Sequence, residues 1–331
     1  MLEIAKRSDA DRSALFTTTA VKVGMNEAIV EKDFWVSWML EILFHHCDYS
    51  DQLSFKGGTS LSKGYGIIER FSEDIDLILD WRILGYELNE PWESRSNSAQ
   101  DRFNDKANEK TIVFLEEILM PHLVQVVQEQ GIEKYKFYID KSDRQTIRFV
   151  YPQIFVDEAL VQEIRLEIGS LAAWTPLTER SITPFVAEQF PQVFSKSNTV
   201  VRTVQAKRTF WEKATILHSE AHRIGSKIPQ RYSRHYYDLY LLYNSQIKEE
   251  AFKDFDLLVK VAAFKQKFYR SNRAKYDEAN KEGLKLLPPQ ESMDDLLQDY
   301  ESMQSMIFGT VIPFEDIVQG LEKMLEEIKY L

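Results

Sequence analysis

The sequence predicts an α+β fold with two lobes: a first lobe built around a mixed or antiparallel sheet, and a second that is mostly helical. Three observations lead to this prediction. The length of 331 residues suits two domains of ordinary size. Short runs that alternate polar and apolar residues, typical of strands, fall in the first half. Helical spacing of apolar residues dominates the second half.

The elements of the first half follow from periodicity and from turn residues. Two helical segments lie within residues 12–46, and Asn26 is a suitable N-cap for the second. A short buried strand ends at Lys56, where Gly57-Gly58 interrupts it, and a helix is expected over 59–70. Further along, the patterns predict a strand over 73–80, a polar loop over 81–105, a helix over 106–130, and strands over 134–140, 145–151 and 161–168.

The second half predicts helices over 209–221, 231–243, 252–280 and 313–330. The change in character falls near 175–200, in a stretch that contains prolines. We therefore expect a first lobe over 1–185, which includes the N-terminal helices, and a helical lobe over 186–331.

Composition excludes several classes of protein. The chain is 44% hydrophobic, which argues against intrinsic disorder, and Cys47 is its only cysteine, which excludes a disulfide framework and a cysteine zinc site. A net charge of −11 argues against nucleic-acid binding through the whole surface. The N-terminus lacks a signal-peptide core, and no apolar run of about 18 residues suggests a membrane span. We expect a cytoplasmic protein with no membrane partner.

The most informative segment is FKGGTSLSKGYGIIERFSEDIDLIL, residues 55–79. Asp74 and Asp76 are two apart in a predicted strand, so both carboxylates project from one face. Such groups repel each other unless a cation lies between them, and Mg²⁺ prefers oxygen ligands of this kind. The pattern predicts a site for Mg²⁺, or for Mn²⁺, suited to phosphoryl transfer.

The glycine pair lies between a strand and a predicted helix. Without side chains, Gly57 and Gly58 let the backbone approach a ligand closely, and the first N–H groups of a helix favour an anion. Thr59 and Ser60 add hydroxyl donors. We predict that these four residues cradle the triphosphate of an NTP, with positive charge from Lys63 and Arg70 further along. No Walker loop is present.

The segments GGTSLSK and RFSEDIDL resemble the first motif of nucleotidyltransferases related to DNA polymerase β, and more closely that of the AbiEii/AbiGii toxin branch, which includes the MenT toxins. The fifteen residues between Gly58 and Asp74 are typical of this branch. Later segments, from KFYRSNRAKYDEANKEGLKLLP to PFEDIV, extend the resemblance over about residues 50–330. The resemblance implies a polymerase β-like catalytic lobe.

The superfamily pattern includes a third acid on a neighbouring strand. Glu167 in IRLEIG is our choice as the third metal ligand, and Glu163 and Asp140 remain alternatives. TFWEKATIL resembles the family's lysine motif, which carries over to Lys213, and RYSRHYYDLYLL resembles its aspartate motif, which carries over to Asp238. Lys213 would neutralise phosphate charge; Asp238 would be a general base or would orient Lys213.

The resemblance implies a metal-dependent transfer of NMP from an NTP to an acceptor such as a tRNA 3′ end or another RNA. It also implies toxin–antitoxin or abortive-infection biology, with a separately encoded antitoxin as partner. The alternatives are a nucleotidyltransferase acting on a small molecule or protein, and a nucleotide-binding module without catalysis.

Charge is unevenly distributed along the chain. Residues 202–234 hold eight Lys/Arg and two Asp/Glu, a formal +6, whereas residues 69–105 hold ten Asp/Glu and four Lys/Arg, a formal −6. We expect an acidic metal-holding wall to face a basic wall that binds phosphates and an RNA end.

Overall fold

The computed structural model describes residues 1–72, 74–158, 160–173, 175–223, 225 and 228–331. Its contacts divide the chain into two compact units. Unit 1 comprises Met1–Gly64 and Ser72–Thr203, and unit 2 comprises Tyr65–Phe71 and Val204–Leu331. The division after Thr203 lies beyond the expected position at 185/186, because a strand that follows this position joins the sheet of unit 1.

Unit 1 contains a mixed sheet whose seven strands, among the described residues, follow the order β3-β4-β5-β2-β1-β7-β6. Strands β2 and β5, and β1 and β7, pair in parallel, whereas β1/β2, β3/β4 and β4/β5 are antiparallel. This confirms the predicted α+β class with a mixed sheet. The strands are β1 Leu53–Lys56, β2 Ile75–Leu79, β3 Lys136–Ile139, β4 Thr146–Val150, β5 Ile164–Gly169, β6 Leu177–Ile182 and β7 Thr199–Val204.

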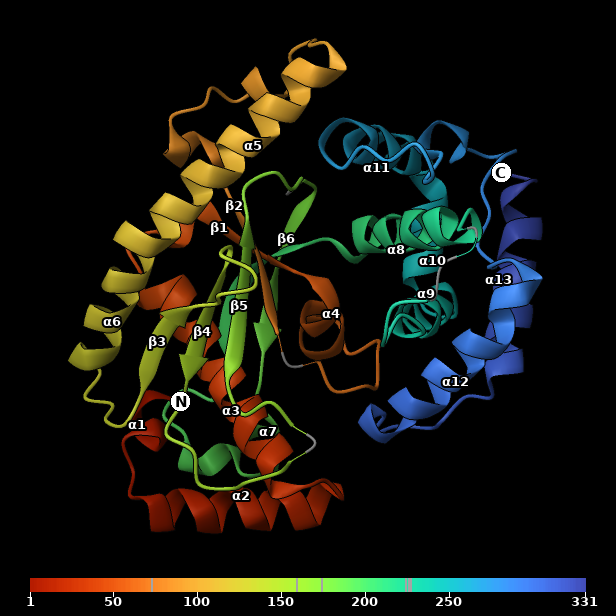
Figure 1. Ribbon diagram of the computed structural model, residues 1–331. Coiled ribbons are helices and arrows are strands. Elements are labelled where there is room, and N and C mark those ends of the chain that lie inside the picture. The colour runs from red at the N-terminus through yellow and green to blue at the C-terminus, as the bar shows by residue number, and fades with distance from the viewer. Residues whose placement is uncertain (73, 159, 174, 224, 226–227) are drawn as a thin grey trace. The chain divides into compact units, whose positions relative to one another are not determined.

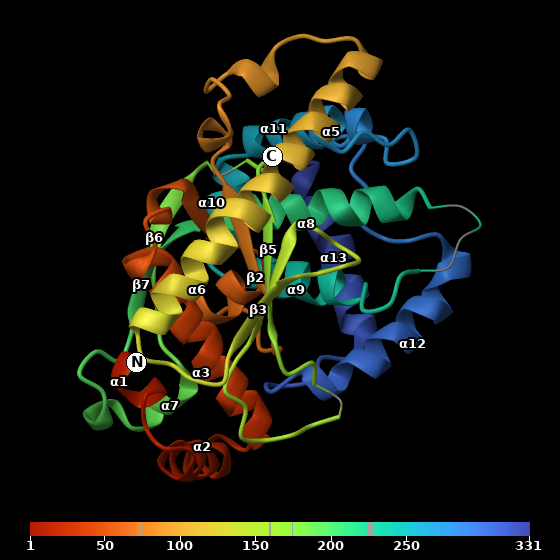
Figure 2. The ribbon, with the colours of Figure 1, turned by 60° about the vertical axis from the view of Figure 1, so that its left-hand side comes forward.

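Helices α3, α5 and α6 of unit 1 cover one face of this sheet (Figures 1 and 2). Trp35 and Trp38 of α3 both pack on Phe149 of β4, and Thr111 of α5 bonds Ser170 at the end of β5 (Oγ–Oγ 2.7 Å). Asn26 caps α3 as predicted, because its side chain accepts the N–H of Ala28. The helices are α1 Leu2–Ala5, α2 Asp9–Val23, α3 Glu27–Glu41, α4 Gly57–Thr59, α5 Asn97–Phe114, α6 Met120–Glu129 and α7 Phe185–Gln189.

Alternation along the strands separates an apolar face from a polar one. The face under the helices carries buried side chains such as Ile75 and Leu77 of β2 and Leu166 of β5. The opposite face carries Asp76 and Glu167, which alternate with those residues. The polar groups of the candidate site therefore lie on the sheet face that α3 and α5 leave uncovered.

A long helix over 97–129 forms from α5, a π-helical turn at Leu115–Leu119 and α6. It begins nine residues before the predicted start at 106, since Ser96 caps its first turn. It is the one helix in the described chain that is long and apolar enough to cross a membrane, a test that core helices also pass. Phe114, Leu119 and Leu123 of this helix are buried, whereas Val113 and Ile118 are exposed.

Two strands, β6 and β7, were not predicted from the sequence. The edge strand β6 has the sequence LTERSI and a mostly exposed or half-exposed pattern, so it lacks the alternation by which strands are recognised. β6 also lies in the proline-containing stretch in which the change between lobes was expected, and its neighbour β7, which alternates better, begins at Thr199, at the end of the 175–200 region.

Unit 2 is helical, as predicted. The segment Tyr65–Phe71 belongs to it: the N–H of Phe71 donates to Met306 O (2.7 Å), and Arg70 forms an antiparallel bridge with Ile307. The helices are α8 Ala206–Ala221, α9 Arg234–Tyr243, α10 Ile247–Lys253, α11 Asp256–Phe268, α12 Met293–Met303 and α13 Phe314–Ile328. The helix expected over 252–280 is shorter in the structure, where α11 spans Asp256–Phe268.

The helix predicted over 59–70 is wrong in its second half. α4 continues into a π-helical turn over Ser60–Gly64, after which helical structure ends. Gly66 adopts a positive φ of 62°, a conformation that a right-handed helix cannot contain. The strand predicted over 73–80 is present as β2, although Glu73 lies outside the described residues.

Candidate functional site

The turn after β1 brings Gly57 against Asp76 of β2. Gly57 has φ +81°, and a Cβ at this position would lie 1.8 Å from Asp76 Oδ2. Lys56 and Asp76 are paired across β1 and β2, which explains the close approach. A side chain is therefore excluded at position 57 both by conformation and by space.

The hydroxyl groups that follow the glycines hold this turn together. Thr59 Oγ1 donates to the main-chain oxygen of Asp74 (2.5 Å) and lies 3.0 Å from Ser72 Oγ. Ser60 Oγ donates to Gly57 O (2.8 Å). Both residues are fully buried. The two side chains thus fix the turn and its link to Asp74, whereas the sequence led us to expect them at the surface of a ligand cradle.

Glu167 and Asp76 are direct neighbours on the parallel strands β5 and β2. Paired residues of adjacent strands point to the same face, so both carboxylates project together, with Asp74 just before β2. Burial, and then the charges of Asp76 and Asp74, raise the pKa of Glu167 to about 7. Neighbouring carboxylates repel one another in this way when no cation lies between them.

A guanidinium lies among these carboxylates. Arg165 Nη2 is 2.9 Å from Glu167 Oε1, and Arg165 Nη1 is 4.0 Å from Asp74 Oδ2. Over the described ranges, no three His, Cys, Asp or Glu side chains are grouped so that they could hold a metal ion. The donor set still fits a hard divalent cation, because it consists of carboxylate oxygens, and such an ion would replace the positive charge of Arg165.

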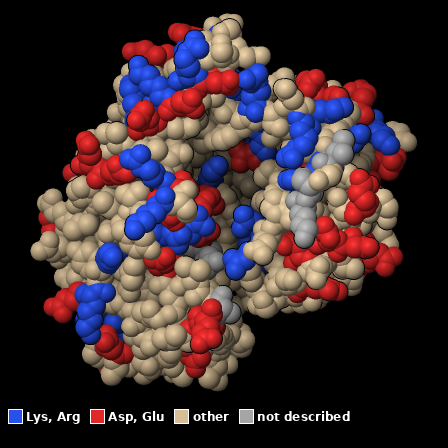
Figure 3. Space-filling view, in the orientation of Figure 1, with Lys and Arg blue, Asp and Glu red and all other residues tan. Residues whose placement is uncertain are grey.

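The alternative third acids belong to a different cluster. Arg148 of β4 pairs with Glu163 (Nη1–Oε1 3.0 Å) and also with Asp140 (Nε–Oδ2 2.7 Å). Tyr138 Oη donates to Glu163 Oε2 (2.7 Å). Figure 3 shows basic and acidic side chains side by side in this part of unit 1, where Figure 1 places β4 and β5. The strand register thus brings Glu167, and neither alternative, next to Asp76.

Lys63 does not lie free beside the glycine turn. Its Nζ is 2.8 Å from Asp33 Oδ1 of α3 and 3.9 Å from the ring centroid of Phe185. Both Lys63 and Asp33 side chains are less than a tenth exposed. The ion pair joins the turn to the helical layer of unit 1. Asp33, in the first helical region, gave no sequence signal of this role.

In unit 2, Arg70, Lys213 and Asp238 form a buried cluster. Arg70 binds Asp238 with two hydrogen bonds (Nε–Oδ1 and Nη2–Oδ2, both 2.8 Å), and Lys213 Nζ donates to Oδ2 (2.7 Å). His235 Nδ1 is 3.2 Å from Lys213 Nζ. Lys213 comes from α8 and Asp238 from α9. Arg70 is therefore a partner of Asp238, and not a residue of a helix that extends from the glycine pair.

Electrostatics keeps this cluster charged. Burial opposes ionisation of Asp238, but Arg70 and Lys213 outweigh it and hold the pKa of Asp238 below its usual range. Burial lowers the pKa of Lys213, although Asp238 counteracts the effect. Burial and then the charge of Lys213 place the pKa of His235 well below its ordinary value, so this imidazole is neutral. A carboxylate with two cationic partners and a low pKa is a poor general base and a good anchor for Lys213.

Comparison with known proteins identifies one family. The family model described as "Nucleotidyl transferase AbiEii toxin, Type IV TA system" matches residues 41–320. No curated protein matches the chain. Among solved structures, the chain is similar to MenT4, a nucleotidyltransferase toxin from Mycobacterium tuberculosis H37Rv, with 14% identity, a TM-score of 0.45, and coverage of 95% of this chain and 98% of that one. It is also similar to JHP933 from Helicobacter pylori, with 14% identity, a TM-score of 0.39, and coverage of 89% and 91%.

Proposed function

The chain belongs to the AbiEii nucleotidyltransferase toxins of type IV toxin–antitoxin systems, and we propose that it transfers an NMP from an NTP to the 3′ end of an RNA such as a tRNA. In this reaction the 3′-hydroxyl oxygen forms a bond to the α-phosphorus and loses its proton to water, the bond from the α-phosphorus to the oxygen that bridges it to the β-phosphate breaks, and pyrophosphate leaves. The pairing of Asp76 with Glu167 on adjacent strands, next to the Gly57 turn, carries the proposal.

Asp74, Asp76 and Glu167 are the residues that would hold Mg²⁺ or Mn²⁺ in this site. A bound divalent ion supplies Lewis-acid stabilisation of the oxygens around the reacting phosphorus. The raised pKa of Glu167 supports this assignment, since a third carboxylate is placed where two others already repel it. Arg165, which pairs with Glu167 and lies 4.0 Å from Asp74, would then be available to pair with a phosphate of the NTP.

The backbone of Gly57, Gly58, Thr59 and Ser60 forms the cradle of the triphosphate in this proposal. The support is local: the turn has no side chain at Gly57 or Gly58, and the hydroxyls of Thr59 and Ser60 keep its shape. Amide N–H groups at such a turn recognise phosphate oxygens without a steric cost.

Lys213 neutralises charge that develops on the phosphates during transfer, and Asp238 holds its ammonium group in place. The roles rest on the family motifs and on the 2.7 Å bond between the two side chains. We assign Asp238 to orientation, and not to proton abstraction, because both of its oxygens are engaged by cations. Lys63 and Arg70 have structural partners, so we assign them support of the turn and of Asp238.

The family description implies an antitoxin partner, and we propose that a separately encoded antitoxin neutralises this chain in the cytoplasm. Expression of wild type and of Asp76→Ala in a bacterial host tests toxicity. Growth arrest that Asp76→Ala relieves supports the toxin role; equal growth of the two strains contradicts it.

Incorporation of label tests the reaction itself. Each of the four α-labelled NTPs is incubated with Mg²⁺ and either total tRNA or whole protein extract, with EDTA and Asp76→Ala as controls. We expect label in tRNA from one or more NTPs, which EDTA and the substitution abolish. Label in protein but not in RNA would favour the alternative acceptor. Label in neither would contradict the proposed function.

A further inference from the structure

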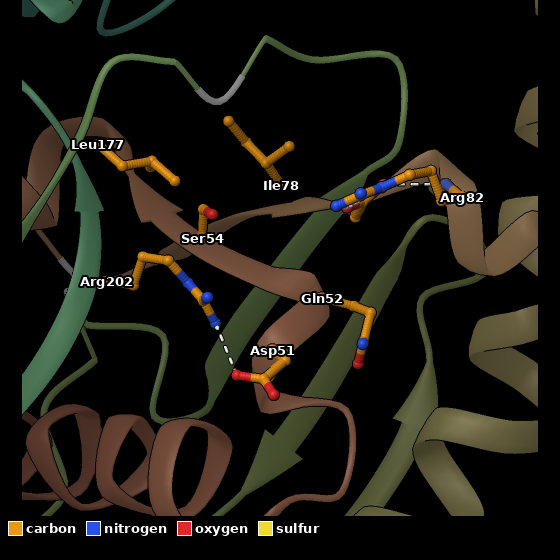
Figure 4. Close-up of a pocket in the computed structure, with 8 residues that line it drawn as sticks. Asp51, Gln52, Ser54, Ile78, Arg82, Leu177 and Arg202 are labelled. Carbon is orange, nitrogen blue, oxygen red and sulfur yellow. Dashed lines mark hydrogen bonds and ion pairs between the residues drawn. The ribbon is translucent and has the colours of Figure 1, made fainter. Parts of the chain in front are cut away.

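A small pocket opens on the polar face of the unit 1 sheet (Figure 4). It has a volume of about 90 Å³. This is well below the roughly 300–1,000 Å³ of pockets that enclose a whole small-molecule ligand, so it fits one end of a larger one. Its lining residues are Asp51, Gln52, Ser54, Ile78, Asp80, Arg82, Leu177 and Arg202.

The strand register places this pocket beside the carboxylates. Ser54 pairs with Ile78 across β1 and β2, and the next pair along the same face is Lys56 with Asp76. In the parallel pairing of β1 and β7, Thr203 is the partner of Phe55. Arg202 therefore lies beside Ser54, on the same face of the sheet. Two residues along a strand span about 6.6 Å. The near wall of the pocket, at Ser54 and Ile78, therefore lies one such step from Asp76 on the same face, and the lining continues away from Asp76 to Asp80.

The walls combine apolar surface with polar groups of both kinds. Ile78 and Leu177 supply apolar surface, Ser54 a hydroxyl and Gln52 an amide. Figure 4 shows the side chains of Arg82 and Arg202 approaching from opposite sides.

The charges of the lining cancel. Asp80 is bonded to Arg82 (Oδ2–Nε 2.8 Å), and Asp51 lies 3.5 Å from Arg202 Nη2. A neutral lining gives a phosphate no net attraction. It suits a flat, uncharged ring with donors and acceptors on its edge, which is the chemistry of a nucleobase.

The arginine of this wall is fixed before any ligand arrives. Arg202 donates from Nη2 to Ser50 O (2.7 Å) and from Nε to Leu53 O (3.2 Å). A guanidinium held by two backbone oxygens keeps its plane and loses little freedom on binding. Ser54, which lines the pocket, is buried, with 7% of its surface exposed.

We propose that this pocket receives the base of the acceptor's 3′-terminal nucleotide. This inference rests on the proposed function, because the 3′-hydroxyl must lie at the carboxylates. The step between Asp76 and the near wall of the pocket, at Ser54 and Ile78, is comparable to the separation between the base and the 3′-hydroxyl of one nucleotide. Binding of the terminal base therefore fixes the attacking oxygen, which is worth a large factor in rate.

The test compares two tRNAs that differ only in the last nucleotide, which carries either its base or an abasic ribose with an intact 3′-hydroxyl. Wild type should use the abasic acceptor with at least tenfold lower kcat/KM. Ser54→Leu fills the pocket, so it should reduce kcat/KM for the normal tRNA at least tenfold and leave the abasic acceptor and the KM for NTP unchanged. Ser54→Ala removes only the hydroxyl and should have a smaller effect.

Two further variants complete the design. Val200→Leu enlarges an apolar side chain by one methylene at an exposed position of β7 outside the lining, and should behave as wild type. Leu177→Trp fills the pocket from β6 and replaces Ser54→Leu if that variant does not fold.

Each outcome decides between hypotheses. A wild type that uses both tRNAs equally, or a Ser54→Leu variant that loses activity equally on both, overturns the inference. If Ser54→Leu raises only the KM for NTP, the inference is overturned too, and the pocket is assigned to the base of the incoming nucleotide. If folded wild type labels neither tRNA, the proposed function itself fails, and the inference with it.

Discussion

Gly57 and Asp76 are in van der Waals contact only because residue 57 has no side chain. A Cβ there would lie 1.8 Å from Asp76 Oδ2 and 2.6 Å from Cγ. The glycine thus lets the turn after β1 close over Asp76, the second carboxylate of the Asp74/Asp76 pair. The first motif is in this sense one structural unit, in which the glycine pair and the aspartate pair depend on each other.

Gly57→Ala should therefore abolish NMP transfer, with a loss of about 100-fold or more, because Asp76 must move. Gly85→Ala is the matched control. Gly85 has nearly the same φ, +83°, yet its nearest neighbour is the flexible end of Lys110 at 4.0 Å. Both variants should lose about 1–2 kcal/mol of stability from the positive φ. Equal transfer activity in the two variants would contradict the role of the contact.

Glu167→Gln distinguishes the third acid from its alternatives. We expect transfer to fall about 100-fold or more, because one ligand oxygen of the metal site is lost. The thermal midpoint at pH 8 should not decrease, since the substitution relieves repulsion by Asp76 and Asp74. Glu163→Gln, four residues earlier, should retain transfer and lose stability, because Glu163 bonds Arg148 and Tyr138. Loss of transfer in Glu163→Gln, with transfer retained in Glu167→Gln, would identify Glu163 as the third acid.

Local features of the site could be predicted from the sequence, and long-range pairings could not. The glycine turn and the strand of Asp76 are encoded by neighbouring residues, and both are present. That Glu167 stands beside Asp76 follows from a parallel pairing of strands distant in the chain, which periodicity cannot reveal. Family resemblance supplied that acid.

Arg70 shows most clearly that local sequence patterns do not reveal long-range pairings. Its helix was predicted from spacing, although Gly64 and Gly66 oppose helical structure there. Its partner Asp238 is 168 residues away, so no local pattern links the two. The edge strand β6 was missed for a different reason: its polar sequence carries no apolar alternation.

Lys213→Met should separate catalysis from stability. We expect transfer to fall about 100- to 1,000-fold, as for loss of one group that stabilises charge in the transition state. The fold should persist, because Arg70 still neutralises Asp238 through two bonds. Lys207→Met on the same helix is the control, since Lys207 pairs with Asp254 (2.8 Å) and is assigned no catalytic role. Full activity of Lys213→Met would contradict our assignment.

Asp238→Ala should instead destabilise unit 2. It leaves Arg70 and Lys213 buried without their shared carboxylate, and breaking a buried ion pair costs about 3–5 kcal/mol. Chemical denaturation monitored by tryptophan fluorescence measures this cost. The double variant Asp238→Ala/Lys213→Met should recover part of the loss, because one unpaired charge is removed. Additive losses in the double variant would show that the cluster is not coupled.

Glu31 provides a pH dependence that is independent of the candidate site. Its carboxylate, in α3, accepts the N–H groups of Ile154 and Phe155, but burial outweighs these bonds and raises its pKa to about 7. The folded state therefore holds a proton that the unfolded state, with an ordinary glutamate pKa of 4.5, releases. This contribution to stability is full below about pH 4.5 and is lost as the pH rises to about 7.

Replacing Glu31 by Gln removes the titration, so the free energy of unfolding of wild type should fall relative to Glu31→Gln by about 2–3 kcal/mol between pH 5 and pH 8. Glu27→Gln, at a half-exposed position on the same helix, should run parallel to wild type. Urea denaturation of all three proteins at each pH measures the difference. If Glu31→Gln and wild type remain parallel, the side chain is ionised in the folded protein, and its bonds to Ile154 and Phe155 outweigh the cost of burial.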